Sequence, residues 1–178
     1  STMPSYEAGD APWNRVLGEV RGMRIECLGK EFNIPDYAFS AISAQNPALR
    51  NIQKVWFTGD SLESIVIGKY AFSGNEELVG VSSKLITQIG VGCFMGCKNL
   101  GYASQYSLNN VPDFAFYNCE KLTECDFSKT TTIGRSAFEG TNLSTVNLSL
   151  AKSVGNNAFT NCGIQTIWFG LSTKDSKF

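Results

Sequence analysis

A short phrase recurs six times along this chain at nearly constant spacing. It consists of Ile or Val, then Gly or Pro, two variable residues, Ala or Cys, and finally Phe. The six copies end at Phe39, Phe72, Phe94, Phe116, Phe138 and Phe159, and only the first interval is clearly longer than the others. A nearly fixed period of this length is typical of a stacked repeat array, which offers one long surface rather than one deep cleft.

The second half of each unit predicts a short strand. It reads L-x-x-V-x-L, as at Leu143, Val146 and Leu148, and alternates at its end as a half-buried strand should. A strand of this length cannot bury its own face, whereas stacking at about 4.8 Å per strand creates a continuous core. We therefore predict an α/β solenoid, a right-handed coil with a parallel sheet on one face and short helical or 3₁₀ segments on the other. The Phe residues are expected to form a ladder inside.

Small residues flank this Phe ladder in the repeated phrase. The Gly or Pro after the first aliphatic residue is expected to start a turn, since Gly accepts positive φ and the Pro ring presets a negative φ suited to turns. The Ala before each Phe is explained by crowding, because a larger side chain would push adjacent coils apart.

The repeat also sets the expected boundaries. Residues 1–33 contain no Ala-Phe unit and are expected to form an N-terminal cap. Six repeats are expected to follow, at residues 34–66, 67–88, 89–110, 111–132, 133–153 and 154–170, before a C-terminal tail at residues 171–178. In the irregular first repeat, residues 41–60 are expected to hold an elongated helix and then a strand at residues 52–57.

Residues 133–148 resemble a known family. The run from Ile133 to Phe138, followed by Leu143, Val146 and Leu148, resembles the BspA-type leucine-rich repeats of bacterial surface proteins. Their usual form is I-G-x-x-A-F-x-x-C-x-x-L-x-x-I-x-L/I, and residues 89–105 and 111–127 are similar to it nearly throughout. The resemblance implies a leucine-rich-repeat coil in a secreted or cell-surface bacterial protein that binds host proteins, other cells or matrix. It implies no catalytic residues and no cofactor.

Composition and charge disfavour other classes of function. Histidine is absent, which removes the usual general base and the commonest metal ligand. The formal net charge is −1 and no basic block stands out, so the footprint of a nucleic-acid-binding protein is missing. No apolar run approaches the length of a membrane span. The first residues do not resemble a signal peptide, so we expect that a signal was removed or that the chain starts inside a longer protein.

The six cysteines invite two interpretations. Cys93 and Cys97 are spaced as a pair of metal ligands can be, but a matching second pair is missing. The repeat instead puts Cys97, Cys119 and Cys162 at one ladder position, where free cysteine behaves as a small buried hydrophobe. We expect no metal and six reduced thiols, with a Cys97–Cys119 bridge as the alternative. The remaining cysteines are Cys27 and Cys125.

Outward-facing strand positions are the candidate partner-binding surface. They comprise Trp56, Tyr102, Ser104, Tyr106, Glu124, Asp126, Asn147 and Trp168. Exposed Tyr and Trp side chains suit recognition because they bury a large area with few rotatable bonds. Alternatively, the two tryptophans cover the ends of the sheet or pack against further repeats.

Three functions follow from these observations. The first is a non-catalytic extracellular module that recognises a protein or glycan partner through its sheet face, as adhesion proteins do. The second is an architectural spacer within a larger bacterial surface protein. The third is a hydrolase that uses Glu124 and Asp126, which share one face of a strand. The missing histidine and the lack of any sign of an enclosing pocket argue against the hydrolase. The sequence sets neither the ligand nor the oligomeric state.

Overall fold

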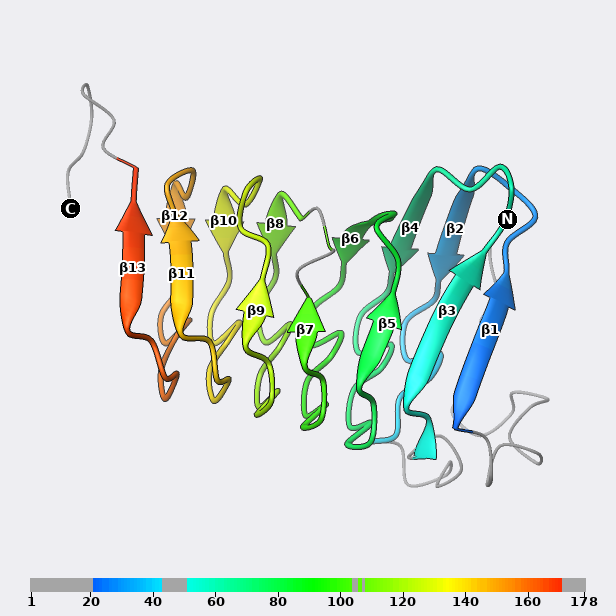
Figure 1. The fold of residues 1–178 in the computed structure, drawn as a ribbon, viewed down its shortest axis with the longest axis horizontal. Coiled ribbons are helices and arrows are strands. Elements are labelled where there is room, and N and C mark those ends of the chain that lie inside the picture. The colour runs from blue at the N-terminus through cyan, green and yellow to red at the C-terminus, as the bar shows by residue number, and fades with distance from the viewer. Residues whose placement is uncertain (1–20, 43–50, 104–105, 107, 171–178) are drawn as a thin grey trace.

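The computed structural model describes residues 21–42, 51–103, 106 and 108–170, which form an elongated array of stacked coils (Figure 1). Each coil contributes one strand to a front face and one, running the opposite way, to a back face (Figure 1). The front strands are β1 (Gly22–Glu26), β3 (Lys54–Thr58), β5 (Gly80–Ser82), β7 (Tyr102–Ala103), β9 (Glu124–Cys125), β11 (Thr145–Leu148) and β13 (Thr166–Phe169). The back strands are β2 (Glu31–Ile34), β4 (Ser64–Ile67), β6 (Ile86–Ile89), β8 (Asn110–Val111), β10 (Thr132–Ile133) and β12 (Ser153–Val154).

All paired strands are parallel, and equivalent repeat positions stand opposite one another. Val55 of β3 faces Met23 of β1 and Val81 of β5, while Val146 of β11 faces Ile167 of β13. This register confirms the predicted solenoid of stacked units. The handedness of the coil stays a prediction.

A column of stacked rings fills the interior, as the repeat predicts. Successive ring centroids in the Phe ladder lie 5.3, 5.6, 5.5, 5.2 and 5.5 Å apart from Phe39 to Phe159. The rings are nearly parallel, and all but the last are buried. Phe127 meets Phe138 edge-on at 5.4 Å and closes the front side of the column. Offset stacking adds to the free energy gained by burying each ring.

The structure corrects the prediction of helical segments. In the described residues, each Ala-Phe segment is a run of turns, and the Ile or Val that opens each phrase lies in a second, back sheet. Turns replace a helix because left-handed backbone recurs two residues before each Phe, as at Tyr70 (φ 53°) and Phe114 (φ 56°). Such a residue cannot continue a right-handed helix. The second sheet follows from the β-branched residues at the start of each phrase.

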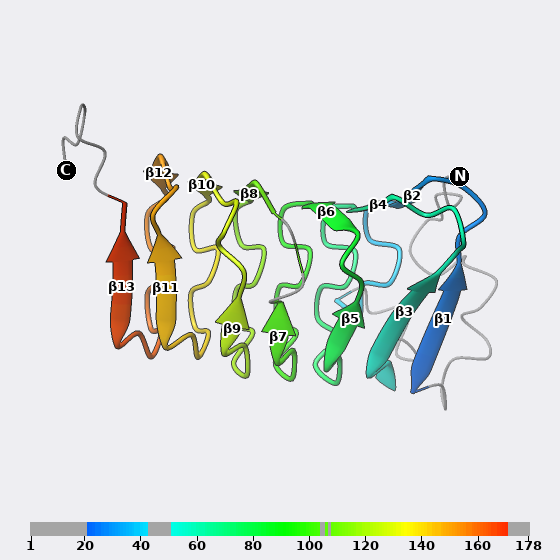
Figure 2. The ribbon, with the colours of Figure 1, turned by 45° about the horizontal axis from the view of Figure 1, so that its top comes forward.

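Backbone N–H groups in these turns alternate between two kinds of partner. The N–H of Cys93 donates to the Gly90 carbonyl within the turn, whereas the N–H of Phe94 donates to Ala115 in the next coil. The N–H of Met95 again donates within the turn, to Gly92. The turns therefore form a third hydrogen-bonded track along the array, beside the two sheets (Figure 2).

The glycine of the repeated phrase is needed for close packing rather than for positive φ. Gly68, Gly90, Gly134 and Gly155 are absent from the positive-φ residues. A Cβ at Gly134 would instead clash with the backbone nitrogen of Asp113 in the preceding coil. The expectation that these glycines supply a positive φ was therefore wrong. They are needed because only glycine lets the two backbones approach so closely.

The back sheet is interrupted where this packing fails. No ladder joins β6 to β8 in the described residues. Pro112 stands there in place of the glycine, and it has no N–H to donate to the preceding coil, as Gly134 donates to Val111. The front ladder is also interrupted, between β5 and β7 and between β9 and β11.

The N-terminal part of the array starts earlier than the repeat pattern indicates. β1 and most of β2, which ends at Ile34, lie in residues 1–33, which we expected to be a cap, and they pair with β3 and β4 in register. The expected strand at residues 52–57 corresponds to β3. The expected elongated helix falls mostly on residues 43–50, which lie outside the described part, as do residues 1–20 and the C-terminal tail. The other predicted boundaries stay predictions.

Candidate functional site

The front face carries two rows of outward side chains, which the strand register holds in line. In one row Trp56 stands between Arg24 and the backbone of Ser82, and Asn147 stands beside Trp168. In the other row Thr145 faces Thr166. The alternation of each strand sends these residues outward and its Val and Leu residues inward. Within each group of paired strands, these positions therefore lie in line on one face.

Most predicted surface residues that can be described are accessible. The side chain of Trp56 is 41% exposed and that of Trp168 is 62% exposed. Glu124 and Asn147 are exposed, and Asp126 is half-buried. Ser104 and the side chain of Tyr102 lie outside the described residues.

Tyr106 is a correction to the predicted surface, because its side chain is only 1% exposed. Its ring stacks on Phe94 at 6.0 Å, and its hydroxyl donates to the Val81 carbonyl at 2.8 Å. Burial holds the pKa of Tyr106 well above its usual range, with nearby thiols adding to the effect. The repeat alignment assigns the inward place to Gln105, one residue earlier, and for that reason put Tyr106 outside.

Trp56 borders a shallow hollow at the N-terminal end of the front face. A Cβ on Gly22 would lie 2.8 Å from the Trp56 ring, so the indole packs over this glycine. The hollow measures about 400 Å³ and is lined by Gly22, Arg24, Trp56, Phe57 and Thr58. The indole thus covers part of β1 and keeps an exposed part for contact.

A second hollow opens on the front face where the ladder between β9 and β11 is interrupted. It measures about 430 Å³ and is lined by residues 123–128 together with Ser144, Thr145 and Asn147. Asp126 accepts a hydrogen bond from the Ser128 N–H at 2.8 Å, and Asn147 accepts one from the Ser149 N–H at 3.0 Å. These equivalent turns hold the two side chains in place on either side of the break.

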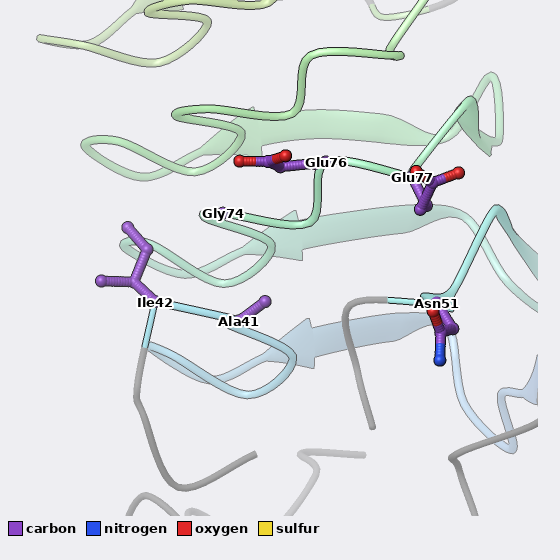
Figure 3. A pocket seen from close by; sticks show the side chains of 6 residues that line it. All are labelled: Ala41, Ile42, Asn51, Gly74, Glu76 and Glu77. Atoms are coloured by element: carbon purple, nitrogen blue, oxygen red, sulfur yellow. The ribbon is translucent and has the colours of Figure 1, made fainter. Parts of the chain in front are cut away.

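A third hollow, of about 440 Å³, lies on the turn side of the first coils (Figure 3). Its lining residues are Ala41, Ile42, Asn51, Gly74, Glu76 and Glu77. Glu76 forms an ion pair with Lys98 at 3.0 Å. Residues 43–50, which adjoin this hollow in the chain, lie outside the described part, so it is not a candidate site.

All six cysteines are free thiols in this structure. Three of them are more than apolar filling, because their sulfur atoms donate to a Phe carbonyl of the preceding coil. Cys97 reaches Phe72 and Cys119 reaches Phe94, each at 3.1 Å, and Cys162 reaches Phe138 at 2.9 Å. Asn75 makes the same bond to Phe39 at 2.6 Å. The sequence carried this signal, since Cys, Asn and Thr at this position all have a donor.

Burial suppresses the acidity of most of these thiols. Removal from water holds the pKa of Cys93 and Cys119 well above its usual range and raises the pKa of Cys97 and Cys125. The thiolate is the nucleophilic form of cysteine, so these residues are poor nucleophiles at neutral pH.

Sequence reasoning missed a group of aromatic residues on the turn side. Tyr37 and Tyr70 stack at 5.3 Å, and the Arg135 guanidinium lies 4.8 Å from the centroid of the Phe114 ring. Tyr37, Tyr70 and Phe114 all occupy the position two residues before the ladder Phe. That recurrence was the available signal.

Two searches of the described residues were negative. Residues 21–42, 51–103, 106 and 108–170 contain no cluster of three or more His, Cys, Asp or Glu side chains suited to a metal ion. The same residues contain no helix of the length and hydropathy that a membrane crossing requires.

Comparison with known proteins agrees with this architecture. A leucine-rich repeat protein from Bacteroides ovatus ATCC 8483 has a similar fold, with a TM-score of 0.51 and 16% sequence identity. The similarity covers 84% of this chain and 49% of that protein, so this chain spans about half the length of that protein. No curated protein matches the chain. The family model of the BspA type leucine-rich repeat region matches residues 32–165 in six copies. This chain therefore belongs to the family of BspA-type leucine-rich repeat proteins.

Proposed function

We propose that this chain is a non-catalytic recognition module that binds a protein or glycan through its front face. The observation that carries the proposal is the pair of exposed tryptophans, Trp56 and Trp168, which both belong to the outward side chains of the front face. Trp56 lines one hollow, and Trp168 stands beside Asn147, which lines another. A long face of register-aligned side chains is the surface that repeat proteins offer to partners. Indole rings at such positions bury much area at low conformational cost.

We further propose that the module acts at the bacterial cell surface or in the secreted fraction. Membership of the BspA-type family supports that location, because such repeats resemble those of bacterial surface proteins. The buried, protonated thiols are also compatible with an oxidising environment, since a thiol without water contact and without thiolate character reacts slowly.

A non-catalytic role fits the setting of the carboxylates on the front face. Glu124 is exposed and Asp126 is half-buried, and neither lies in an enclosed, water-poor pocket. Carboxyl groups that act as general acids at neutral pH are usually found in such pockets, because burial there keeps the proton bound. Asp126→Asn is the test of the remaining hydrolase alternative: hydrolytic activity that this substitution abolished would revive it.

The proposal is tested by binding to immobilised host matrix proteins and to a glycan array. The double variant Trp56→Ala, Trp168→Ala is expected to lose binding while keeping its circular dichroism spectrum and unfolding midpoint. The matched control is Tyr37→Ala, which removes an equally exposed aromatic ring from the turn side, where Tyr37 is 58% exposed. Equal loss in the control, or unchanged binding by the double variant, would contradict a role for the front face.

A second candidate is the architectural spacer, and one observation favours it. At the β13 end of the array, Val154 is 45% exposed, Ile167 43% and Phe169 55%, although the equivalent residues in inner coils are buried. Such an end is suited to stacking against further protein. Force-induced unfolding of the chain within its natural context, together with absent ligand binding, would support this function instead.

A further inference from the structure

The break between β9 and β11 separates two pairs of front-face strands. β9 pairs with β7, and β11 pairs with β13, but no ladder links the two pairs. The two coils are joined just before the break, where the Asn142 N–H donates to the Leu122 carbonyl at 3.0 Å. Beyond that bond the ladder is interrupted, and residues of the two coils line the open hollow of about 430 Å³.

The lining of this hollow contains many hydrogen-bond donors and acceptors. Hydroxyls come from Thr123, Ser128, Ser144 and Thr145, carboxylates from Glu124 and Asp126, and an amide from Asn147. Asp126 and Asn147 each commit one side-chain oxygen to their own turn. The second carboxylate oxygen and the amide NH₂ group have no partner among the residues that the structure describes.

The charge of the lining narrows the class of ligand. Two carboxylates and no Lys or Arg side chain line the hollow, which disfavours phosphates, sulfates and acidic sugars. Neutral sugar hydroxyls, by contrast, donate to carboxylate oxygens and accept from amide NH₂ groups, and the bonds to a carboxylate are of the stronger, charge-assisted kind.

An aromatic platform stands next to the hollow in the same row. Trp168 faces Asn147 across the β11–β13 pair, so its backbone lies one strand spacing, about 4.8 Å, from a residue that lines the hollow. With 62% of its side chain exposed, the indole offers a large apolar surface against which the C–H face of a sugar ring would pack. Asp126, the hollow, Asn147 and Trp168 thus follow one another across the strands.

We propose that this site binds a neutral oligosaccharide, with one sugar hydrogen-bonded between Asp126 and Asn147 and the next stacked on Trp168. The proposal rests on recognition by the front face and gives that recognition a place and a ligand class. It leaves the hollow beside Trp56 for other contacts.

Two substitutions test the site without disturbing its turns. Asp126→Asn and Asn147→Asp both keep the oxygen that accepts the N–H two residues on, so both variants should fold normally. With neutral oligosaccharides as probes in isothermal titration calorimetry, each is expected to weaken binding about tenfold or more, because each exchanges an acceptor for a donor or the reverse. Trp168→Ala is expected to abolish measurable binding. Affinity for a neutral probe should hardly change with salt.

The control for charge is Asn33→Asp, which makes the same change on β2 of the back face and should leave binding unaltered. A cationic peptide in the hollow would behave oppositely, binding Asn147→Asp more tightly than the native chain and weakening steeply with salt; this result would overturn the proposal. Unchanged glycan affinity in both isosteric variants, with loss in Trp56→Ala, would refute this site and leave the front face as the recognition surface. If neither tryptophan variant altered any binding, the proposed function itself would fail.

Discussion

From the coil of Phe72 onward, each coil contains left-handed backbone at two fixed places. Two residues after the ladder Phe, the chain has Gly or Asn, as at Gly96 (φ 74°) and Asn118 (φ 54°), which tolerate this conformation. Two residues before it, bulky side chains such as Tyr70 and Phe114 occupy the same strained region. Each costs about 1–2 kcal/mol, which ring contacts to Tyr37 and to Arg135 help to offset.

Gly96 allows this backbone strain to be measured separately from crowding. A Cβ added at Gly96 would come no closer than 3.8 Å to other atoms, so Gly96→Ala tests conformation rather than clash. We expect the free energy of unfolding to fall by about 1–2 kcal/mol, measured by urea denaturation. Gly101→Ala is the matched control, because Gly101 has open space and no positive φ; it should be neutral or slightly stabilising. Equal effects would show that φ is not the cause.

At the scale of single residues, the sequence predicts a conformation only where the residue type itself favours it. The Gly and Asn residues after each Phe are recognisable signals of left-handed backbone, whereas Tyr70 and Phe114 are not, because aromatic residues rarely adopt it. Tyr106 was misplaced because it follows the end of β7, where the alternation of a strand no longer sets which side chain points inward.

The Phe ladder is the element that the repeat predicted most directly, and its energetics follow from its geometry. Phe116 is buried and stacks on Phe94 at 5.5 Å and on Phe138 at 5.2 Å. Neighbouring rings cannot collapse into a vacancy, because the turn track fixes the spacing of the coils through bonds such as that from the Phe116 N–H to Ala137. A lost ring therefore leaves a cavity.

Phe116→Ala is expected to lower the free energy of unfolding by about 3–5 kcal/mol, through lost burial and a residual cavity. Asp126→Ala is the comparison, expected from the sequence to cost less than about 0.5 kcal/mol as a surface site. The hydrogen bond to Ser128 places it toward the upper end of that range. Chemical denaturation that ranked the two variants the other way would falsify the assignment of inside and outside.

Strands could be predicted where apolar side chains recur with a fixed period. Segments whose conformation is set by hydrogen bonds to the next coil were missed. The L-x-x-V-x-L pattern placed the front strands, as at Val146 and Leu148, which are buried while Asn147 is exposed. The turns escaped prediction because alternate N–H groups bond to the next coil, a contact that no local period records. The hollow at the β9–β11 break was invisible for the same reason, although its residues Glu124, Asp126 and Asn147 were all singled out.

The whole molecule contains four desolvated thiols that should make its stability depend on pH. Desolvation raises the pKa of Cys93, Cys97, Cys119 and Cys125 in the folded chain, whereas unfolded thiols ionise at about pH 8.5. Above that pH the unfolded chain binds fewer protons than the folded chain, so the free energy of unfolding falls as pH rises. Below it both states are protonated and the thiols have no effect.

This dependence is measured by urea unfolding at several pH values from neutral to alkaline. The comparison variant is Cys119→Thr, because Thr141 holds the equivalent position and its hydroxyl finds an acceptor there, the Phe138 carbonyl of its own coil. This variant should lose part of the alkaline destabilisation without a large change in stability at neutral pH. A native chain whose stability stayed flat above about pH 8.5 would contradict the predicted burial of the thiols.

The turn track has a mechanical consequence for the array. Both sheets are interrupted, the back one at Pro112. On the turn side, by contrast, backbone hydrogen bonds join each coil to the next without a gap, from the Phe39 N–H to Ala71 and on to the Phe138 N–H to Ala158. The turn-side hydrogen bonds thus hold successive coils together even where a sheet ladder is missing. Tension along the axis would be borne there by the turn side, and bending would widen or narrow the spaces between unpaired strands.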